Sequence, residues 1–124
     1  MVHVLDHLLD PAEMLAQIHA KLRPGGTLLI VTHNEASLLR RLLGTRWPPF
    51  CLQHPEIYSP ASLTRLVARA GYNGVKVRPS KNYFPVDFLV RQAAWTVGIK
   101  LGAVPLPKIP LGLQLGNMLT IARR

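Results

Sequence analysis

The sequence predicts an α/β fold, and three segments near its start support that class. Residues 1–4 have the character of the end of an apolar strand, residues 10–22 of a helix, and residues 27–32 of a second apolar strand. A strand, a helix and a strand in this order form the βαβ unit of mostly parallel sheets. Because the second strand is apolar without alternation, we expect both of its faces to be covered.

The first helix has both a start signal and a stop signal. Asp10 suits the N-cap, Pro11 the first helical position, and Glu13 the closing position of a capping box. Its apolar residues recur at helical spacing, at Met14, Leu15, Ile18 and Leu22. Pro24 and the glycines after it end the helix, because proline cannot continue it and glycine accepts a positive φ.

The rest of the chain predicts further helices and strands. We expect, in order, a short helix at 35–43, a Pro-rich and aromatic loop at 46–58, a helix from Ser59 to residue 70, a strand at 75–78, a helix at 86–101, a Pro/Gly-rich connection at 102–116 and a last strand at 117–123. This divides the chain into a core at 1–85, an insert at 86–116 and a final strand at 117–124.

The composition is that of one small folded domain. The chain has 124 residues, of which 48% are hydrophobic and 17% charged, so disorder is not expected. A single cysteine, Cys51, excludes an internal disulfide, and we expect a buried, inert thiol there. The start of the chain lacks signal-peptide character and no stretch has the length of a membrane span, so we expect a cytoplasmic location.

The net charge of +9 is concentrated in the second half of the chain. Residues 1–56 hold five basic and five acidic residues, whereas residues 57–124 hold ten basic residues and one acid, Asp87. This asymmetry predicts an acidic partner: a membrane leaflet, a nucleic acid, or another piece of the same protein. Aromatic and basic residues do not interleave as in single-strand binders, so nucleic acid is the least expected of the three.

Four motifs occur in an order that resembles a known family. They are VHVLDHLLDP at residues 2–11, LRPGGTLLI at 22–30, the series Trp47, His54, Tyr58–Leu63 and Ala70–Tyr72, and LGNMLTIAR at 115–123. Together they resemble class I S-adenosylmethionine-dependent methyltransferases, the group that includes ubiquinone-biosynthesis O-methyltransferases. The resemblance implies the C-terminal half of a Rossmann-like sheet: the end of the fourth strand, then the fifth, sixth and seventh, with flanking helices and a helical insert before the last strand.

The same resemblance implies methyl transfer from S-adenosylmethionine to a small or lipid-like acceptor. A nucleotide-type cofactor needs a Gly-rich βα turn and an acid at the next strand end, but the chain contains no G-x-G-x-G. We therefore expect the N-terminal cofactor-binding half to be absent and this chain alone to be inactive. A late gene start, a truncated pseudoenzyme and a split protein all fit. An unpaired sheet edge predicts association with the missing half or with itself.

Candidate site residues follow the carboxyl ends of two predicted strands, where open α/β sheets bind their ligands. By resemblance, His3, Val4 and Asp6 flank the cofactor. His7 and His54 are candidate catalytic groups, because imidazole can accept a hydroxyl proton near neutral pH. Structural roles are the alternative: Asp6 capping a turn, and both histidines acting as hydrogen-bonding or packing residues. His3 and His7 are four residues apart, but no third ligand is obvious, so we expect no metal.

Three further residues are candidate substrate contacts: His33, Trp47 and Tyr58. His33 ends a predicted strand and could instead cap the next helix. The apolar insert carries Trp95 and several cations, so it suits either a lipid-facing lid with peripheral membrane contact or a cover packed on its own domain. The alternative to an enzyme is a basic module that binds a membrane surface or nucleic acid.

Overall fold

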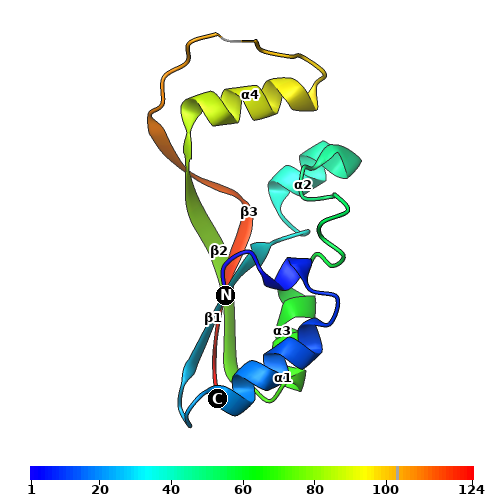
Figure 1. The fold of residues 1–124 in the computed structure, drawn as a ribbon, viewed down its shortest axis with the longest axis vertical. Coiled ribbons are helices and arrows are strands. Elements are labelled where there is room, and N and C mark those ends of the chain that lie inside the picture. The colour runs from blue at the N-terminus through cyan, green and yellow to red at the C-terminus, as the bar shows by residue number, and fades with distance from the viewer. Residues whose placement is uncertain (103) are drawn as a thin grey trace. The chain divides into compact units, whose positions relative to one another are not determined.

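A computed structural model describes residues 1–102 and 104–124, and residue 103, within the predicted insert, lies outside this description. Its sheet has the strand order β1-β3-β2 (Figure 1). The strands are β1 (Thr27–His33), β2 (Asn73–Pro85) and β3 (Pro110–Arg123). The helices are α1 (Pro11–Lys21), α2 (Leu38–Leu43), α3 (Pro60–Arg69) and α4 (Val86–Thr96), with 3-10 turns η1 (Leu5–His7) and η2 (Gly44–Arg46).

The described chain divides into two compact units. Met1–Ser80 and Gly116–Arg124 form the first unit, which contains the hydrophobic core and the candidate site. Lys81–Leu115 form the second, which we call the insert unit. The division into 1–85, 86–116 and 117–124 stays a prediction, and each unit is described by itself.

The first unit opens with the predicted parallel pairing and ends with an antiparallel strand. Val2 pairs in parallel with Val31 of β1. The backbone N–H of His3 donates to the Val31 carbonyl at 2.9 Å, and the Val31 N–H donates to the Met1 carbonyl at 2.9 Å. β3 runs antiparallel to β1. The predicted α/β class is thus confirmed.

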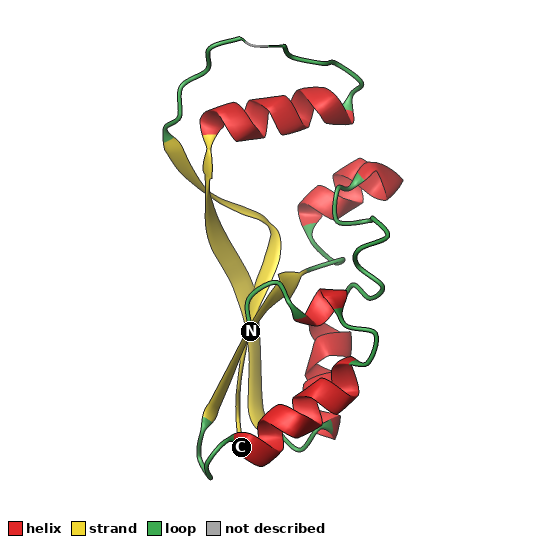
Figure 2. Ribbon diagram, viewed as in Figure 1, coloured by secondary structure: helices red, strands yellow, loops and turns green. Residues whose placement is uncertain are grey.

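Only one face of β1 is covered by the described residues. Leu28, Ile30 and Thr32 are buried, whereas Leu29 between them is 43% exposed. α1 and α3 both lie on the same side of the sheet (Figure 2), so they cover one face and leave the other open. The expectation that both faces are covered is therefore wrong for this chain.

α1 and α3 begin at the N-caps that their sequences predict, but the expected capping box does not form at α1, where the Glu13 carboxylate accepts from Gln17 instead. The Asp10 carboxylate accepts a hydrogen bond from the backbone N–H of Glu13 at 2.9 Å, and Ser59 and Ser62 form a reciprocal capping box at α3. These caps satisfy N–H groups that lack a partner in the first helical turn. The cap residues fix where both helices start beneath the sheet.

Two other helix boundaries differ from the prediction. α2 begins at Leu38 rather than at residue 35, because Ser37 is its N-cap and accepts from the N–H of Arg40. α4 ends at Thr96 rather than at residue 101, because Gly98 adopts a φ of 82°, which is incompatible with a continuing helix. Within the described ranges, no helix combines the length and apolarity needed to cross a membrane.

The last two strands are longer than predicted. β2 reaches Pro85, and β3 already begins at Pro110, inside the expected Pro/Gly-rich connection. Gly112 lies close to the neighbouring strand, since a Cβ there would lie 2.9 Å from the ring of the exposed Tyr83. Turn-forming residues therefore serve strand packing in this segment, which local signals do not reveal.

Gly71 ends α3 in a conformation that favours glycine. Its φ is 92°, and a Cβ there would lie 3.2 Å from the His19 ring. We expect Gly71→Ala to lower the free energy of unfolding by about 1 to 2 kcal/mol in thermal or urea denaturation. Gly102→Ala is the control, because open space surrounds that glycine and its φ is not positive. Equal losses in both variants would contradict this explanation.

Candidate functional site

Four imidazole rings gather at the carboxyl end of β1. His33 is the last residue of that strand, and His3 follows the parallel bridge at Val2. The ring centroids of His3 and His33 lie 5.1 Å apart, those of His33 and His54 lie 4.8 Å apart, and those of His54 and His7 lie 4.4 Å apart. The structure thus brings together all four histidines that the sequence identified as candidates.

A buried carboxylate contacts this cluster. Asp6 is fully buried, and its Oδ2 lies 2.5 Å from Nδ1 of His33. Burial alone would raise the pKa of Asp6, but the hydrogen bond from His33 and backbone donors outweigh it, so this pKa lies below its ordinary value of 3.8. Asp6 is therefore ionised at neutral pH and holds a negative charge against the His33 ring.

The turn η1 places Asp6 in that position. Leu5 within the turn is fully buried in the core, and the N–H of His7 donates to the Val4 carbonyl at 3.0 Å. The chain enters the turn through His3, whose φ of 49° is the sole positive value among the non-glycine residues that the structure describes. Such a backbone conformation costs free energy and is found preferentially at functional sites.

The Asp6 contact fixes the tautomer of His33. A carboxylate can only accept a hydrogen bond, so Nδ1 of His33 carries the hydrogen and the Nε2 of the neutral ring keeps its lone pair. The His33 side chain is 18% exposed, whereas Asp6 is fully buried. The pair therefore presents one basic nitrogen backed by a buried negative charge.

His7 and His54 have the same tautomer but neutral partners. Nδ1 of His7 lies 2.8 Å from the Gln53 carbonyl oxygen, and Nδ1 of His54 lies 2.7 Å from the Pro49 carbonyl oxygen. Both Nδ1 atoms therefore donate, and each Nε2 keeps a lone pair. Neither ring is backed by a carboxylate, which distinguishes both from His33.

His3 supplies a neutral imidazole to the cluster. Burial lowers its pKa from the ordinary value of 6.5, and the neighbouring His33 lowers it further, against the opposite effect of Asp6. Its side chain therefore carries no charge at neutral pH.

Three donors in the cluster could hold a cation in principle. His3, Asp6 and His33 each offer one ligand atom, all within 4.8 Å of one another, and two imidazoles with a carboxylate suit divalent transition metals. The 2.5 Å contact between Asp6 and His33 instead places a proton between the facing atoms. The arrangement is thus suited to proton transfer, and the expectation that no metal binds stays a prediction.

The two aromatic candidates are buried. Trp47 is 1% exposed and lies edge-on to His33, with ring centroids 6.1 Å apart. The Tyr58 hydroxyl donates to Glu56 at 2.7 Å, and burial together with this hydrogen bond raises its pKa. Their role as substrate contacts stays a prediction.

Sequence reasoning missed one pair in the loop before α3. The expectation of a buried Cys51 is wrong, because the thiol is exposed and its Sγ lies 3.2 Å from Nδ1 of His54; that the thiol is inert stays a prediction. A tight turn brings the two together, because the N–H of His54 donates to the Cys51 carbonyl at 3.1 Å. The spacing of three residues between Cys51 and His54 was the signal in the sequence that could have predicted this contact.

Comparison with known proteins identifies the family. A sequence profile described as a methyltransferase domain matches residues 1–77. The chain belongs to this methyltransferase domain family. The resemblance to this family is thereby confirmed.

Relatives and solved structures agree with this methyltransferase assignment. The ubiquinone biosynthesis O-methyltransferase of Aeromonas salmonicida (strain A449) is 30% identical over 95 residues, covering 67% of this chain and 40% of the relative. A SAM-dependent methyltransferase of Thermotoga maritima superposes with a TM-score of 0.61 at 16% identity. This match covers 99% of this chain and 53% of that protein. A second SAM-dependent methyltransferase, from Archaeoglobus fulgidus, superposes with a TM-score of 0.56 at 16% identity. This match covers 100% of this chain and 57% of that protein. The chain therefore spans about half the length of these proteins.

The family and its structural neighbours imply S-adenosylmethionine as the cofactor. The rim residues of this methyltransferase chain are compatible with it. Beside the neutral His3 a cationic sulfonium would meet no like charge, and the Asp6 carboxylate would add a negative charge nearby. Val4 beside them is 42% exposed, so it offers apolar surface at the same rim.

Proposed function

We propose that this chain is part of a longer enzyme that methylates a small or lipid-like acceptor, with His33 as the general base. The observation that carries the proposal is the 2.5 Å contact between the buried Asp6 carboxylate and Nδ1 of His33. An imidazole oriented and charge-balanced in this way can remove a proton from an acceptor hydroxyl.

The proposed step moves one proton at a defined atom. Nε2 of His33 takes the proton of the acceptor hydroxyl, and the oxygen keeps the electron pair with which it bonds to the methyl carbon. Asp6 remains ionised and stabilises the imidazolium, so it is a positioning residue. S-adenosylmethionine, when bound, would supply the electrophilic methyl group, whose bond to sulfur breaks and leaves its electron pair on that sulfur as a neutral thioether. His3 and Val4 are the residues of this chain that would hold it.

The other candidates take supporting roles in this proposal. His54 packs against His33 with ring centroids 4.8 Å apart, so it limits where that ring can turn. His7 is held by the Gln53 carbonyl and supports His54. This assignment differs from the sequence hypothesis, in which His7 and His54 were the catalytic groups, because only His33 has a charged partner.

We further propose that the 124-residue chain does not transfer methyl groups by itself. Its sequence has no Gly-rich turn for the cofactor, and it spans 40% of the curated relative. The exposed face of β1 around Leu29 provides apolar surface for a further segment or a second copy.

The competing function is a non-enzymatic basic module that binds a membrane surface or nucleic acid. The net charge of +9 favours it. That function gives no reason for a strained His3 beside a buried Asp6–His33 pair, whereas proton transfer does.

Calorimetric titration with S-adenosylmethionine tests the proposal. The 124-residue chain is compared with the same chain extended upstream in frame. Binding by the extended form alone is the expected result. Binding by the short chain would contradict the proposed dependence on a further segment, and binding by neither would contradict the enzyme proposal itself and favour the basic module.

A further inference from the structure

The insert unit exposes large apolar side chains along both α4 and the loop that follows. No residue of α4 is buried, and Trp95 is 66% exposed. Among the side chains of the unit that the structure describes, the other exposed large apolar residues are Tyr83, Phe88, Val90, Val97, Ile99, Val104, Ile109 and Leu111. Grouped apolar exposure of this kind marks a binding surface.

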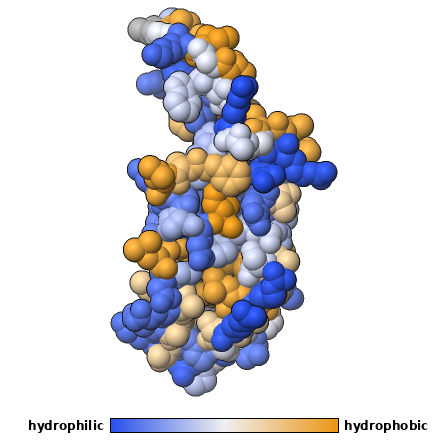
Figure 3. Space-filling view, turned by 90° about the vertical axis from the view of Figure 1, so that its right-hand side faces the viewer, coloured by the Kyte–Doolittle hydropathy of each residue, from blue (hydrophilic) through white to orange (hydrophobic). Residues whose placement is uncertain are grey.

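Cations accompany this apolar surface. The unit holds one acid, Asp87, and four basic residues, Lys81, Arg91, Lys100 and Lys108. Arg91 has an internal role, since its guanidinium donates to the backbone carbonyls of Leu101, Gly102 and Val104. Lys100 and Lys108 are exposed. In Figure 3, hydrophobic and hydrophilic side chains alternate over the part of the surface that this unit forms.

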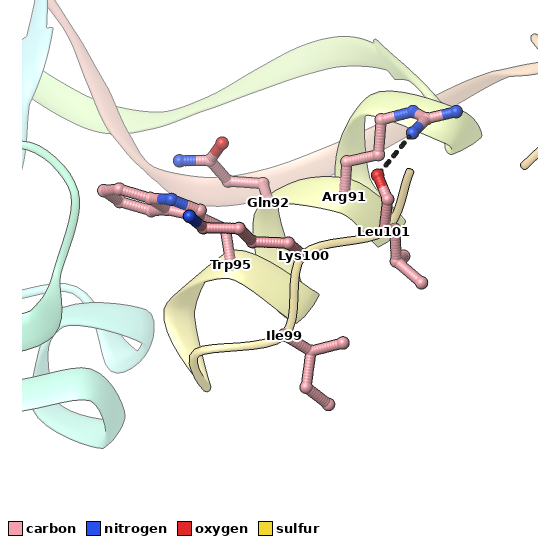
Figure 4. Close-up of a pocket in the computed structure, with 6 residues that line it drawn as sticks. All are labelled: Arg91, Gln92, Trp95, Ile99, Lys100 and Leu101. Carbon is pink, nitrogen blue, oxygen red and sulfur yellow. Dashed lines mark hydrogen bonds between the residues drawn. The ribbon is translucent and has the colours of Figure 1, made fainter. Parts of the chain in front are cut away.

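A pocket in the unit brings the two kinds of side chain together. It has a volume of about 570 Å³ and is lined by Arg91, Gln92, Trp95, Ile99, Lys100 and Leu101. Trp95 and Lys100 extend to one side of it, whereas Arg91 turns toward the carbonyl of Leu101 (Figure 4). An exposed indole beside an ammonium group is suited to the lipid headgroup region, where the ring lies among the headgroups and the cation meets phosphate.

We propose that the insert unit docks on an anionic phospholipid surface, with Trp95 entering the headgroup layer and Lys100 contacting lipid phosphate. A second copy docked through this same unit would bring its four basic residues and one acid against an identical set, which opposes pairing at this surface. Nucleic acid offers phosphates but would leave exposed aliphatic residues such as Ile99 and Ile109 against a polar surface. The proposal does not depend on the proposed methyl transfer.

Vesicle sedimentation with the full 124-residue chain tests this docking. We expect binding to phosphatidylcholine vesicles that contain phosphatidylglycerol, much weaker binding to phosphatidylcholine alone, and weakening at high salt. Lys100→Glu is expected to reduce the partition coefficient about fivefold or more, and Trp95→Ala about tenfold. Brominated lipids should quench the emission of Trp95 but spare the buried Trp47, and Trp95→Phe should abolish that quenching.

Matched changes in the first unit serve as controls. Arg23→Glu makes the same charge reversal at an exposed site, and Leu9→Ala removes a side chain that is 91% exposed. Both should leave binding unchanged. The proposal is overturned if the chain ignores anionic vesicles, if Arg23→Glu weakens binding as much as Lys100→Glu, or if Trp95 is shielded by concentration-dependent self-association. Preference for a DNA duplex over vesicles would overturn it as well.

Discussion

Replacing His33 by glutamine in the upstream-extended protein is expected to lower kcat by about 10² to 10⁴-fold, the range for loss of a general base. Glutamine can still donate a hydrogen bond to Asp6, but it offers no nitrogen that accepts a proton near neutral pH. Because the acceptor still fits the site, KM should change little. Initial rates over a series of acceptor concentrations, which separate kcat from KM, check this result.

The neighbouring histidines give matched controls for this result. His7→Gln and His54→Gln make the same chemical change in rings whose Nδ1 groups face neutral carbonyls. We expect each to cost much less in kcat than His33→Gln. If His54→Gln proved the most damaging of the three, the sequence hypothesis would be right and the charged partner of His33 would have only a structural role.

Local signals in the sequence were sufficient for much of the fold. Asp10 and Ser59 cap their helices as predicted, because an N-cap depends on residues only three positions apart. The apolar run of β1 likewise forms a strand. The prediction that both faces of β1 are covered was wrong. A continuous apolar run shows that both faces of a strand can be buried, but it does not show whether this chain has segments that cover both of them.

The site depended on contacts that no local signal reports. His33 was placed on the correct rim, since strand ends can be read from the sequence, but its bond to Asp6 joins residues 27 positions apart. That pairing follows from the buried Leu5 and the turn at His3, which only tertiary packing defines. The sequence therefore could not predict which of the four histidines is the best candidate for the general base. All four are the same residue type, and only their hydrogen-bond partners differ.

Replacing Asp6 by asparagine is expected to lower the free energy of unfolding at neutral pH by about 1.5 to 3 kcal/mol, the net worth of a hydrogen bond to a charged group. The pKa of Asp6 is lower in the folded protein than its ordinary 3.8, so the unfolded state takes up its proton first as the pH falls. The carboxylate's contribution is therefore complete above about pH 5 and is lost as the pH drops through the folded value. Urea denaturation across this range should show the wild type and the variant converging below pH 3.8.

Asp10→Asn makes the same charge change at an exposed carboxylate, and asparagine is an equally good N-cap, so it should cost little at any pH. A constant gap between wild type and Asp6→Asn at all pH values would show that Asp6 acts by shape and not by charge. In the extended enzyme, Asp6→Asn should also reduce kcat, because the neutral amide no longer stabilises the imidazolium of His33. If the two residues act as one unit, adding His33→Gln to Asp6→Asn should lower kcat no further than His33→Gln alone, whereas multiplying losses would separate their roles.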